Sequence, residues 1–129
     1  MDVNLKIAEA LGIQILSDFE ESMGLAEYPY ICIEIQGMPT FSQQGKDGYY
    51  SSFWWSLNGP DSGNTRSVIE NYLTKMGWDI TVVINKTGCH YELDLFDEDN
   101  IHTGKEVTTR TYDTAELALI EAAREVLDI

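Results

Sequence analysis

The alternation of apolar and polar residues is most regular after residue 77, where it predicts a β-hairpin. Apolar side chains occupy every second position of segment 78–85, as in a strand with one face toward a core: Trp78, Ile80, Val82 and Ile84. The next four residues, Asn85-Lys86-Thr87-Gly88, place glycine where a tight hairpin turn needs a positive φ. Segment 89–96 alternates again and is expected to return as the paired strand, with four inward side chains: Cys89, Tyr91, Leu93 and Leu95.

Three segments have the apolar spacing of amphipathic helices. Segment 64–76 begins at an Asn64 or Thr65 cap and stops at Gly77, with an apolar stripe of Val68, Ile69, Tyr72, Leu73 and Met76. Segment 114–127 follows the capping signature Asp113-Thr114-Ala115-Glu116, and its buried side is expected to carry Leu117, Ile120, Ala123 and Leu127. A shorter helix is expected to start at an Asp2 cap and to end at Gly12, with an apolar stripe of Leu5, Ile7, Ala8 and Leu11.

The rest of the chain is less regular. Tyr30–Ile35 alternates as a strand, residues 37–48 have the composition of a surface loop, and residues 58–63 break regular structure. Residues 13–28 mix apolar and acidic positions without a clear period. A third C-terminal strand, 105–112, is expected after an acidic turn at 97–104.

The order of these elements predicts the fold class. Strands follow one another in the C-terminal half instead of alternating with helices, which favours an α+β fold with an antiparallel sheet. We therefore expect a C-terminal three-stranded meander packed against helices in a layered sandwich. At 129 residues without an evident linker, the chain is expected to form a single domain, 1–129.

Several short motifs resemble those of one known family. They are Gly59-Pro60-Asp61-Ser62-Gly63-Asn64 before a helix, Trp78 opening the hairpin, and the closing helix 114–123 with its sequence Thr-Ala-Glu-Leu-Ala-Leu-Ile-Glu-Ala-Ala. Together with Lys6–Gly12, which is similar to that family's opening helix, they resemble the phage ABA-sandwich domain of small bacteriophage and prophage proteins. The resemblance covers mainly residues 59–128, and the loop at 37–48 replaces the family's more regular linker. It implies a layered α/β fold and a phage context, but no chemistry.

The net charge of the chain reduces the number of functions that the protein can be expected to have. The chain carries 22 acidic and 8 basic residues, a formal charge of −14, and has no base between Lys6 and Lys46. Such a field repels nucleic-acid phosphates and anionic membranes and attracts basic partners. No signal-peptide pattern and no apolar run of roughly 20 residues is visible, so a cytoplasmic protein of a bacterial host is expected, without membrane or direct nucleic-acid binding.

No motif predicts catalysis, a cofactor or a metal. The acids around Asp97 lack the alternate spacing and central glycine of a calcium loop, and His90 and His102 look too few and too scattered for zinc. There is no nucleophile elbow and no phosphate-binding loop, so no enzyme is predicted. Cys32 and Cys89 are interpreted as two buried thiols, with a single disulfide as the alternative.

Two hypotheses from different classes follow. The first is a non-enzymatic acidic interaction protein that inhibits a basic, nucleic-acid-binding host protein by charge mimicry, with acids in place of phosphates and aromatic side chains as anchors. Its predicted partner-binding residues are Tyr49, Tyr50, Trp54, Asp97, Glu98 and Asp99. The alternative is a small-molecule binder or uncharacterised enzyme with an aromatic pocket around residues 49–55. The oligomeric state is left open.

Overall fold

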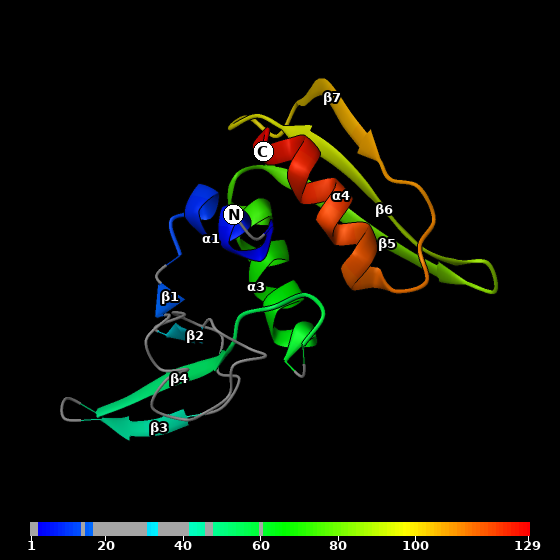
Figure 1. Cartoon of the computed structure of the whole chain (residues 1–129). Helices are drawn as coiled ribbons and strands as arrows, with labels where there is room; N and C mark the ends of the chain where they lie inside the picture. Colours follow the sequence, from blue (N-terminus) through cyan, green and yellow to red (C-terminus); the bar gives the residue numbers. More distant parts are fainter. Residues whose placement is uncertain (1–2, 14, 17–30, 34–41, 46–47, 60) are drawn as a thin grey trace. The chain divides into compact units, whose positions relative to one another are not determined.

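The computed structural model describes residues 3–13, 15–16, 31–33, 42–45, 48–59 and 61–129, with the backbone alone at 15–16, 31–33, 42–45 and 48–54. In chain order the elements are α1 (Val3–Leu11), β1 (Ile15–Leu16), β2 (Ile31–Ile33), β3 (Ser42–Gly45), β4 (Gly48–Trp54), α3 (Ser62–Lys75), β5 (Trp78–Asn85), β6 (Gly88–Phe96), β7 (His102–Thr108) and α4 (Ala115–Leu127) (Figure 1).

The chain divides into two compact units, Met1–Val68 and Ile69–Ile129, with the boundary inside α3. The single domain therefore stays a prediction.

The C-terminal unit confirms the predicted meander and the α+β class. Strands β5, β6 and β7 form an antiparallel sheet in that order, and α4 packs on β6 and β7. The hairpin has the predicted two-residue turn, because Asn85 pairs with Gly88 and φ of Gly88 is +130°. Strand β7 begins three residues earlier than expected, at His102. Beyond its end, Thr109 and Tyr112 still hydrogen-bond to the backbone of β6.

The inward face of β6 forms the centre of this unit's core. Cys89, Tyr91 and Leu93 are buried there, as the alternation predicted, and Leu95 is partly exposed. The thiol of Cys89 is free, in agreement with the interpretation as a buried thiol. On β5 only Trp78 is buried, whereas Val82 and Ile84 are exposed to 36% and 66%. The prediction that Val82 and Ile84 face the core is therefore wrong.

The buried face of α4 is also rotated from the expected one. Residues Ala115, Ala118, Leu119, Ala122 and Ala123 are buried, a set with spacings of three and four. Of the predicted stripe, Ala123 is buried, Ile120 and Leu127 are partly exposed, and Leu117 is 40% exposed. The N-cap is Thr114, not Asp113: its side-chain oxygen accepts a hydrogen bond from the backbone N–H of Leu117 at 3.2 Å.

Helix α3 begins at Ser62, earlier than the predicted cap at Asn64 or Thr65. The Thr65 hydroxyl instead bonds back to the Asp61 carbonyl and accepts a hydrogen bond from the Ser56 N–H at 3.1 Å. Helix α1 ends at the predicted Gly12, whose φ is +74°. Its expected cap, Asp2, lies outside the described residues.

In the N-terminal unit the side chain of Trp55 is buried and held by a hydrogen bond. Its indole N–H donates to the backbone carbonyl of Asn4 at 2.7 Å, and the Asn4 side-chain oxygen accepts from the Leu57 N–H at 3.0 Å. Ile7, Ala8 and Leu57 are buried as well, whereas Leu5 and Leu11 of the predicted stripe are partly exposed.

The backbone of this unit contains a second antiparallel sheet, in the order β1-β2-β4-β3. Strand β2 lies inside the predicted strand at Tyr30–Ile35. The predicted loop at 37–48 is wrong at 42–45, because Ser42–Gly45 is strand β3 and pairs with β4. Its polar sequence, Ser-Gln-Gln-Gly, has no alternation of its own, so its strand conformation depends on the ladder with Gly48–Ser51.

Candidate functional site: an acidic sheet face

Three carboxylates stand directly opposite one another across the C-terminal sheet. Asp79 on β5 is the register partner of Asp94 on β6, which is in turn the partner of Glu106 on β7. We call these residues the acidic row. Neighbouring strands lie about 4.7–4.9 Å apart, and like charges placed directly opposite destabilise a sheet by roughly 0.2–1 kcal/mol per pair. Taken by themselves, the like charges of the row are therefore expected to oppose pairing of the strands.

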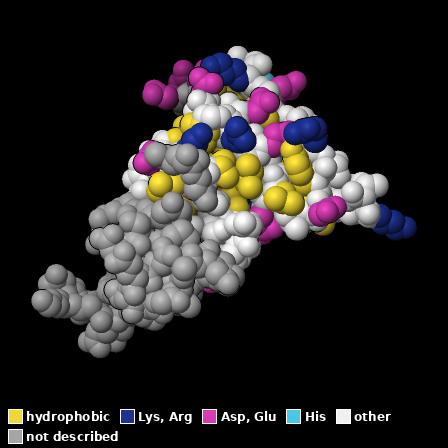
Figure 2. Space-filling model, in the orientation of Figure 1, with side chains coloured by type: hydrophobic (Ala, Val, Ile, Leu, Met, Phe, Trp, Pro, Cys, Tyr) yellow, Lys and Arg dark blue, Asp and Glu magenta, His cyan; other side chains and the backbone are white. Residues whose placement is uncertain are grey.

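The acidic row lies on the sheet face opposite α4. Its positions alternate with the inward residues Trp78, Leu93 and Leu95, and the next pair along this face is Thr81 with Glu92. None of the positions that the strand register places on this face is lysine or arginine: Asp79, Thr81, Val83, Asn85, Gly88, His90, Glu92, Asp94, Phe96, His102, Glu106 and Thr108. On the side that shows α4, by contrast, side chains of both signs are interspersed with hydrophobic ones (Figure 2). The three strands thus present one face with acidic residues and no permanent cation.

His102 lies at one end of this face and is held by two hydrogen bonds. Its Nδ1 accepts from the backbone N–H of Gly104 at 2.9 Å, and its Nε2 lies 3.0 Å from Oδ1 of Asp94. Since Nδ1 is an acceptor, the proton of the neutral ring is on Nε2, which donates to Asp94. The ring also meets Phe96 edge-on, with centroids 5.2 Å apart.

Asp94, His102 and Glu106 bring three metal-ligand types together, with ligand atoms within 4.8 Å of one another. The view of the histidines as scattered is therefore wrong for His102, because the β6–β7 turn folds it back onto Asp94. A metal ion on Nε2 would have to displace its proton while Nδ1 still accepts from Gly104, which a neutral imidazole does not allow. As arranged, His102 and Asp94 are joined by a hydrogen bond, and Glu106 lies close to both.

The predicted turn acids Asp97, Glu98 and Asp99 are exposed between β6 and β7. Asp97 also has a structural role, since its Oδ1 accepts from the N–H groups of Asp99 at 3.0 Å and Ile101 at 2.9 Å. Asn100 takes φ = 61°, a left-handed turn conformation that asparagine tolerates. The turn follows the same strand, β6, that carries Asp94 and Glu92.

The aromatic candidates separate into two groups. Tyr49, Tyr50 and Trp54 belong to β4, and their side chains lie outside what the structure describes. Trp55 is described, and only 1% of its surface is exposed. It is a core side chain, which removes it from the predicted aromatic pocket around 49–55.

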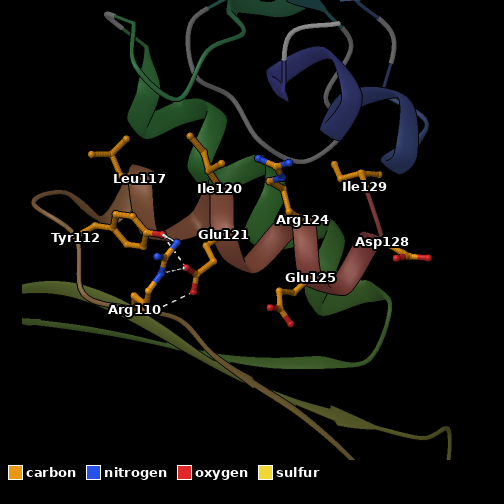
Figure 3. A pocket seen from close by; sticks show the side chains of 9 residues that line it. All are labelled: Arg110, Tyr112, Leu117, Ile120, Glu121, Arg124, Glu125, Asp128 and Ile129. Atoms are coloured by element: carbon orange, nitrogen blue, oxygen red, sulfur yellow. Dashed lines mark hydrogen bonds and ion pairs between the residues drawn. The ribbon is translucent and has the colours of Figure 1, made fainter.

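A second cluster lies beside α4, where Arg110, Tyr112 and Glu121 converge (Figure 3). The Arg110 Nε–H and the Tyr112 hydroxyl both donate to Oε1 of Glu121 at 2.7 Å, and the Arg110 backbone N–H donates to Oε2 at 2.9 Å. They border a shallow depression of about 840 Å³ that Leu117, Ile120 and Arg124 also line.

The pKa directions in this cluster oppose a catalytic role. The hydrogen bond from Tyr112 lowers the pKa of Glu121, and the bond to Glu121 raises the pKa of Tyr112. A phenol with a raised pKa is a poorer acid, and a carboxylate with a lowered pKa is a poorer base. We therefore interpret the cluster as a clamp that fixes residues 110–112 to α4.

Sequence reasoning named the turn acids but missed the acidic row. The hairpin turn that pairs Asn85 with Gly88 already implies that Asp79 pairs with Asp94, so this contact was available from the pattern. The pairing of Glu106 with Asp94 was not available from the pattern, because the register shifts between Asp94 and Phe96.

Comparisons with known proteins identify no relative: no family model, curated protein or solved structure matches the chain. Among the described residues, no helix has the length and apolar character needed to cross a membrane.

Proposed function

We propose that this chain is a non-enzymatic interaction protein whose acidic sheet face binds a basic protein surface of the kind that otherwise holds nucleic acid. The acidic row of Asp79, Asp94 and Glu106 is the observation that carries the proposal. The proposed setting is the cytoplasm of a bacterial host, and the phage or prophage origin rests on the resemblance in the sequence alone.

The reasoning is electrostatic. Adjacent carboxylates on a sheet cost stability, and that cost is recovered when a basic surface neutralises them. The unit Ile69–Ile129 carries 13 acidic and five basic residues, a net charge of −8, so its field steers cationic partners during encounter. A series of carboxylates without interspersed lysine or arginine resembles a phosphate backbone in charge sign and density.

The alternative of an enzyme or small-molecule binder has less support from the described residues. Trp55 is buried, and the Arg110–Tyr112–Glu121 cluster is a clamp whose pKa directions do not favour proton transfer. Tyr49, Tyr50 and Trp54 remain predicted anchors, and Trp54→Ala is expected to raise the dissociation rate of the partner at any salt concentration.

The test is capture from a bacterial lysate with the full chain immobilised, at low and high salt and with duplex DNA as a competitor. The key variant replaces the acidic row: Asp79→Asn, Asp94→Asn and Glu106→Gln. The matched control removes the same number of charges elsewhere: Asp113→Asn, Glu125→Gln and Asp128→Asn, all exposed.

The expected result is a set of basic proteins that the parent chain and the control retain, that duplex DNA displaces, and that the row variant loses. Salt should weaken capture by the parent more than capture by the row variant, because screening acts on exposed charges. Equal retention by the row variant and the control would contradict the proposal, and so would partners that duplex DNA does not displace.

A further inference from the structure

Strand β5 is an open edge that carries exposed apolar side chains. In the part of the chain that the structure describes, β5 pairs only with β6, so its other edge has no partner strand. Val82 and Ile84 were expected in the core, yet they are 36% and 66% exposed. Residues 80–85 contain no charge, proline or glycine, the residues with which proteins usually protect an edge strand.

The hydrogen-bond pattern identifies which residues of β5 offer backbone groups to a partner. Cys89 bonds to Tyr112, and Tyr91 bonds to Thr109, on the β7 side of β6. In an antiparallel ladder such residues do not bond to the strand on their other side. The residues opposite them, Ile84 and Val82, therefore direct their N–H and C=O groups outward, away from β6.

We propose that two copies of this chain associate through β5, with antiparallel pairing centred on Val82, to form one six-stranded sheet. In this register Val82 lies opposite Val82 of the second copy, and Ile80 lies opposite Ile84 of the second copy. Val82 and Ile84, whose backbone groups point away from β6, then pair with apolar residues of the same sheet face. In a two-fold interface of this kind the same residues form both sides, so a pairing that suits one copy suits the other. A second copy of the chain meets this condition, and an unrelated strand does not.

The register also separates the negative charges. Asp79 lies opposite Asn85 of the second copy and beside its Lys86, which places an acid next to a base at both ends. The two copies of Asp79 are offset by six residues, about 20 Å along the strands at 3.4 Å per residue. This distance exceeds the Debye length of about 8 Å at physiological salt, so the acids of the two strands do not oppose pairing. The inference concerns the free edge of β5 and does not rest on the proposed function, with which it shares one residue, Asp79.

The experiment measures the oligomeric state of the full chain by sedimentation over a concentration series, with two matched substitutions. Ile84→Lys places a charge on the edge. Ile101→Lys makes the same change at another exposed isoleucine, 61% exposed, in the turn before β7. We expect a dimer for the parent and for Ile101→Lys, and a dissociation constant raised at least about tenfold for Ile84→Lys, since the change occurs twice per interface.

Cross-linking tests the register independently. Val82→Cys places two thiols across the two-fold axis, with Cα atoms about 5.5 Å apart, within the range of a disulfide. Oxidation should link this variant into dimers faster than it links the parent or Ile101→Cys. A parent that stays monomeric at the highest concentration would overturn the inference. So would equal dimerisation of the two lysine variants, or a dimer in which Val82→Cys fails to cross-link.

Discussion

The hydroxyl of Tyr91 donates a hydrogen bond of 2.6 Å to Oε1 of Glu70, which connects the middle of the sheet to the C-terminal half of α3. Tyr91 is fully buried and Glu70 is partly exposed. The bond joins a neutral phenol to a carboxylate, and hydrogen bonds to charged groups contribute more than neutral ones. It holds the part of α3 within the unit Ile69–Ile129 to the side chain of Tyr91.

Tyr91→Phe should lower the free energy of unfolding by about 1.5–3 kcal/mol, because it removes this bond and leaves the ring in place. Tyr72→Phe is the matched control, since no hydrogen bond of the Tyr72 hydroxyl is found within the described residues. Urea unfolding of the two variants measures the difference. Equal stability of the two would show that the Tyr91 hydroxyl contributes nothing.

The buried face of α4 gives the second prediction. Leu119→Ala should cost about 2–5 kcal/mol, because Leu119 is completely buried and a cavity would remain. Leu117→Ala should cost less than about 1 kcal/mol, because Leu117 is 40% exposed. Chemical denaturation of this pair separates the observed face from the one predicted by the sequence, for which Leu117 would be the more costly site.

The acidic row predicts a conflict between stability and binding. Asp79→Asn should raise the free energy of unfolding by about 0.2–1 kcal/mol, because it relieves repulsion from Asp94. The same change should slow association with a basic partner. Thermal unfolding at low salt gives the first quantity, and Asp113→Asn is the control for overall charge. A loss of stability in Asp79→Asn would show that the row is not under repulsion.

The turn acids Asp97, Glu98 and Asp99 should tolerate replacement by their amides, whereas Asp97→Ala should lower stability. Asp97→Asn keeps the Oδ1 acceptor for the N–H groups of Asp99 and Ile101, whereas Asp97→Ala removes it. We expect the alanine variant to cost about 0.5–2 kcal/mol, as for loss of a side-chain cap, and Asp97→Asn with Glu98→Gln and Asp99→Asn to leave folding nearly intact. Equilibrium unfolding of both variants makes the comparison. Equal stabilities would mean that the Asp97 side chain does not stabilise the turn.

The lowered pKa of Glu121 predicts a pH effect with a definite sign. Its pKa lies below the ordinary value of 4.5, because Tyr112 and then Arg110 donate to the ionised carboxylate. A group with a depressed folded pKa contributes stability that is present above its unfolded pKa and is lost as the pH falls through the folded value.

The parent should therefore be more stable than Glu121→Gln at neutral pH, and the difference should shrink as the pH falls below 4.5. Urea unfolding of both proteins at several pH values measures it, with Glu125→Gln as the control on the same helix. A difference that does not change with pH would contradict the assignment.

The sequence predicted those elements whose signals are local. The strand at 78–85 has the expected bounds because alternation, turn residues and a terminal glycine all agree. Alternation says which residues share a face, but not whether another element covers that face. Val82 and Ile84 were misplaced for this reason, since α4 packs on β6 and β7.

Helix α4 shows a different limit. Apolar residues surround much of its circumference, so Leu117 and Leu119 fit alternative faces, and only packing on the sheet selects Leu119. The acidic row was only partly predictable, because the bulge after Asp94 decides which residue of β7 faces it. Composition gave the sign of the protein's charge, and the strand register gave its location.

The turn between β5 and β6 accepts only glycine at one position, residue 88. A Cβ on Gly88 would lie 2.3 Å from the carbonyl oxygen of Tyr112, and its φ of +130° already disfavours any other residue. The exposed neighbours Lys86 and Thr87 have no such restriction. In a library randomised at 86–88 and selected for folding, positions 86 and 87 should diversify freely while position 88 returns glycine.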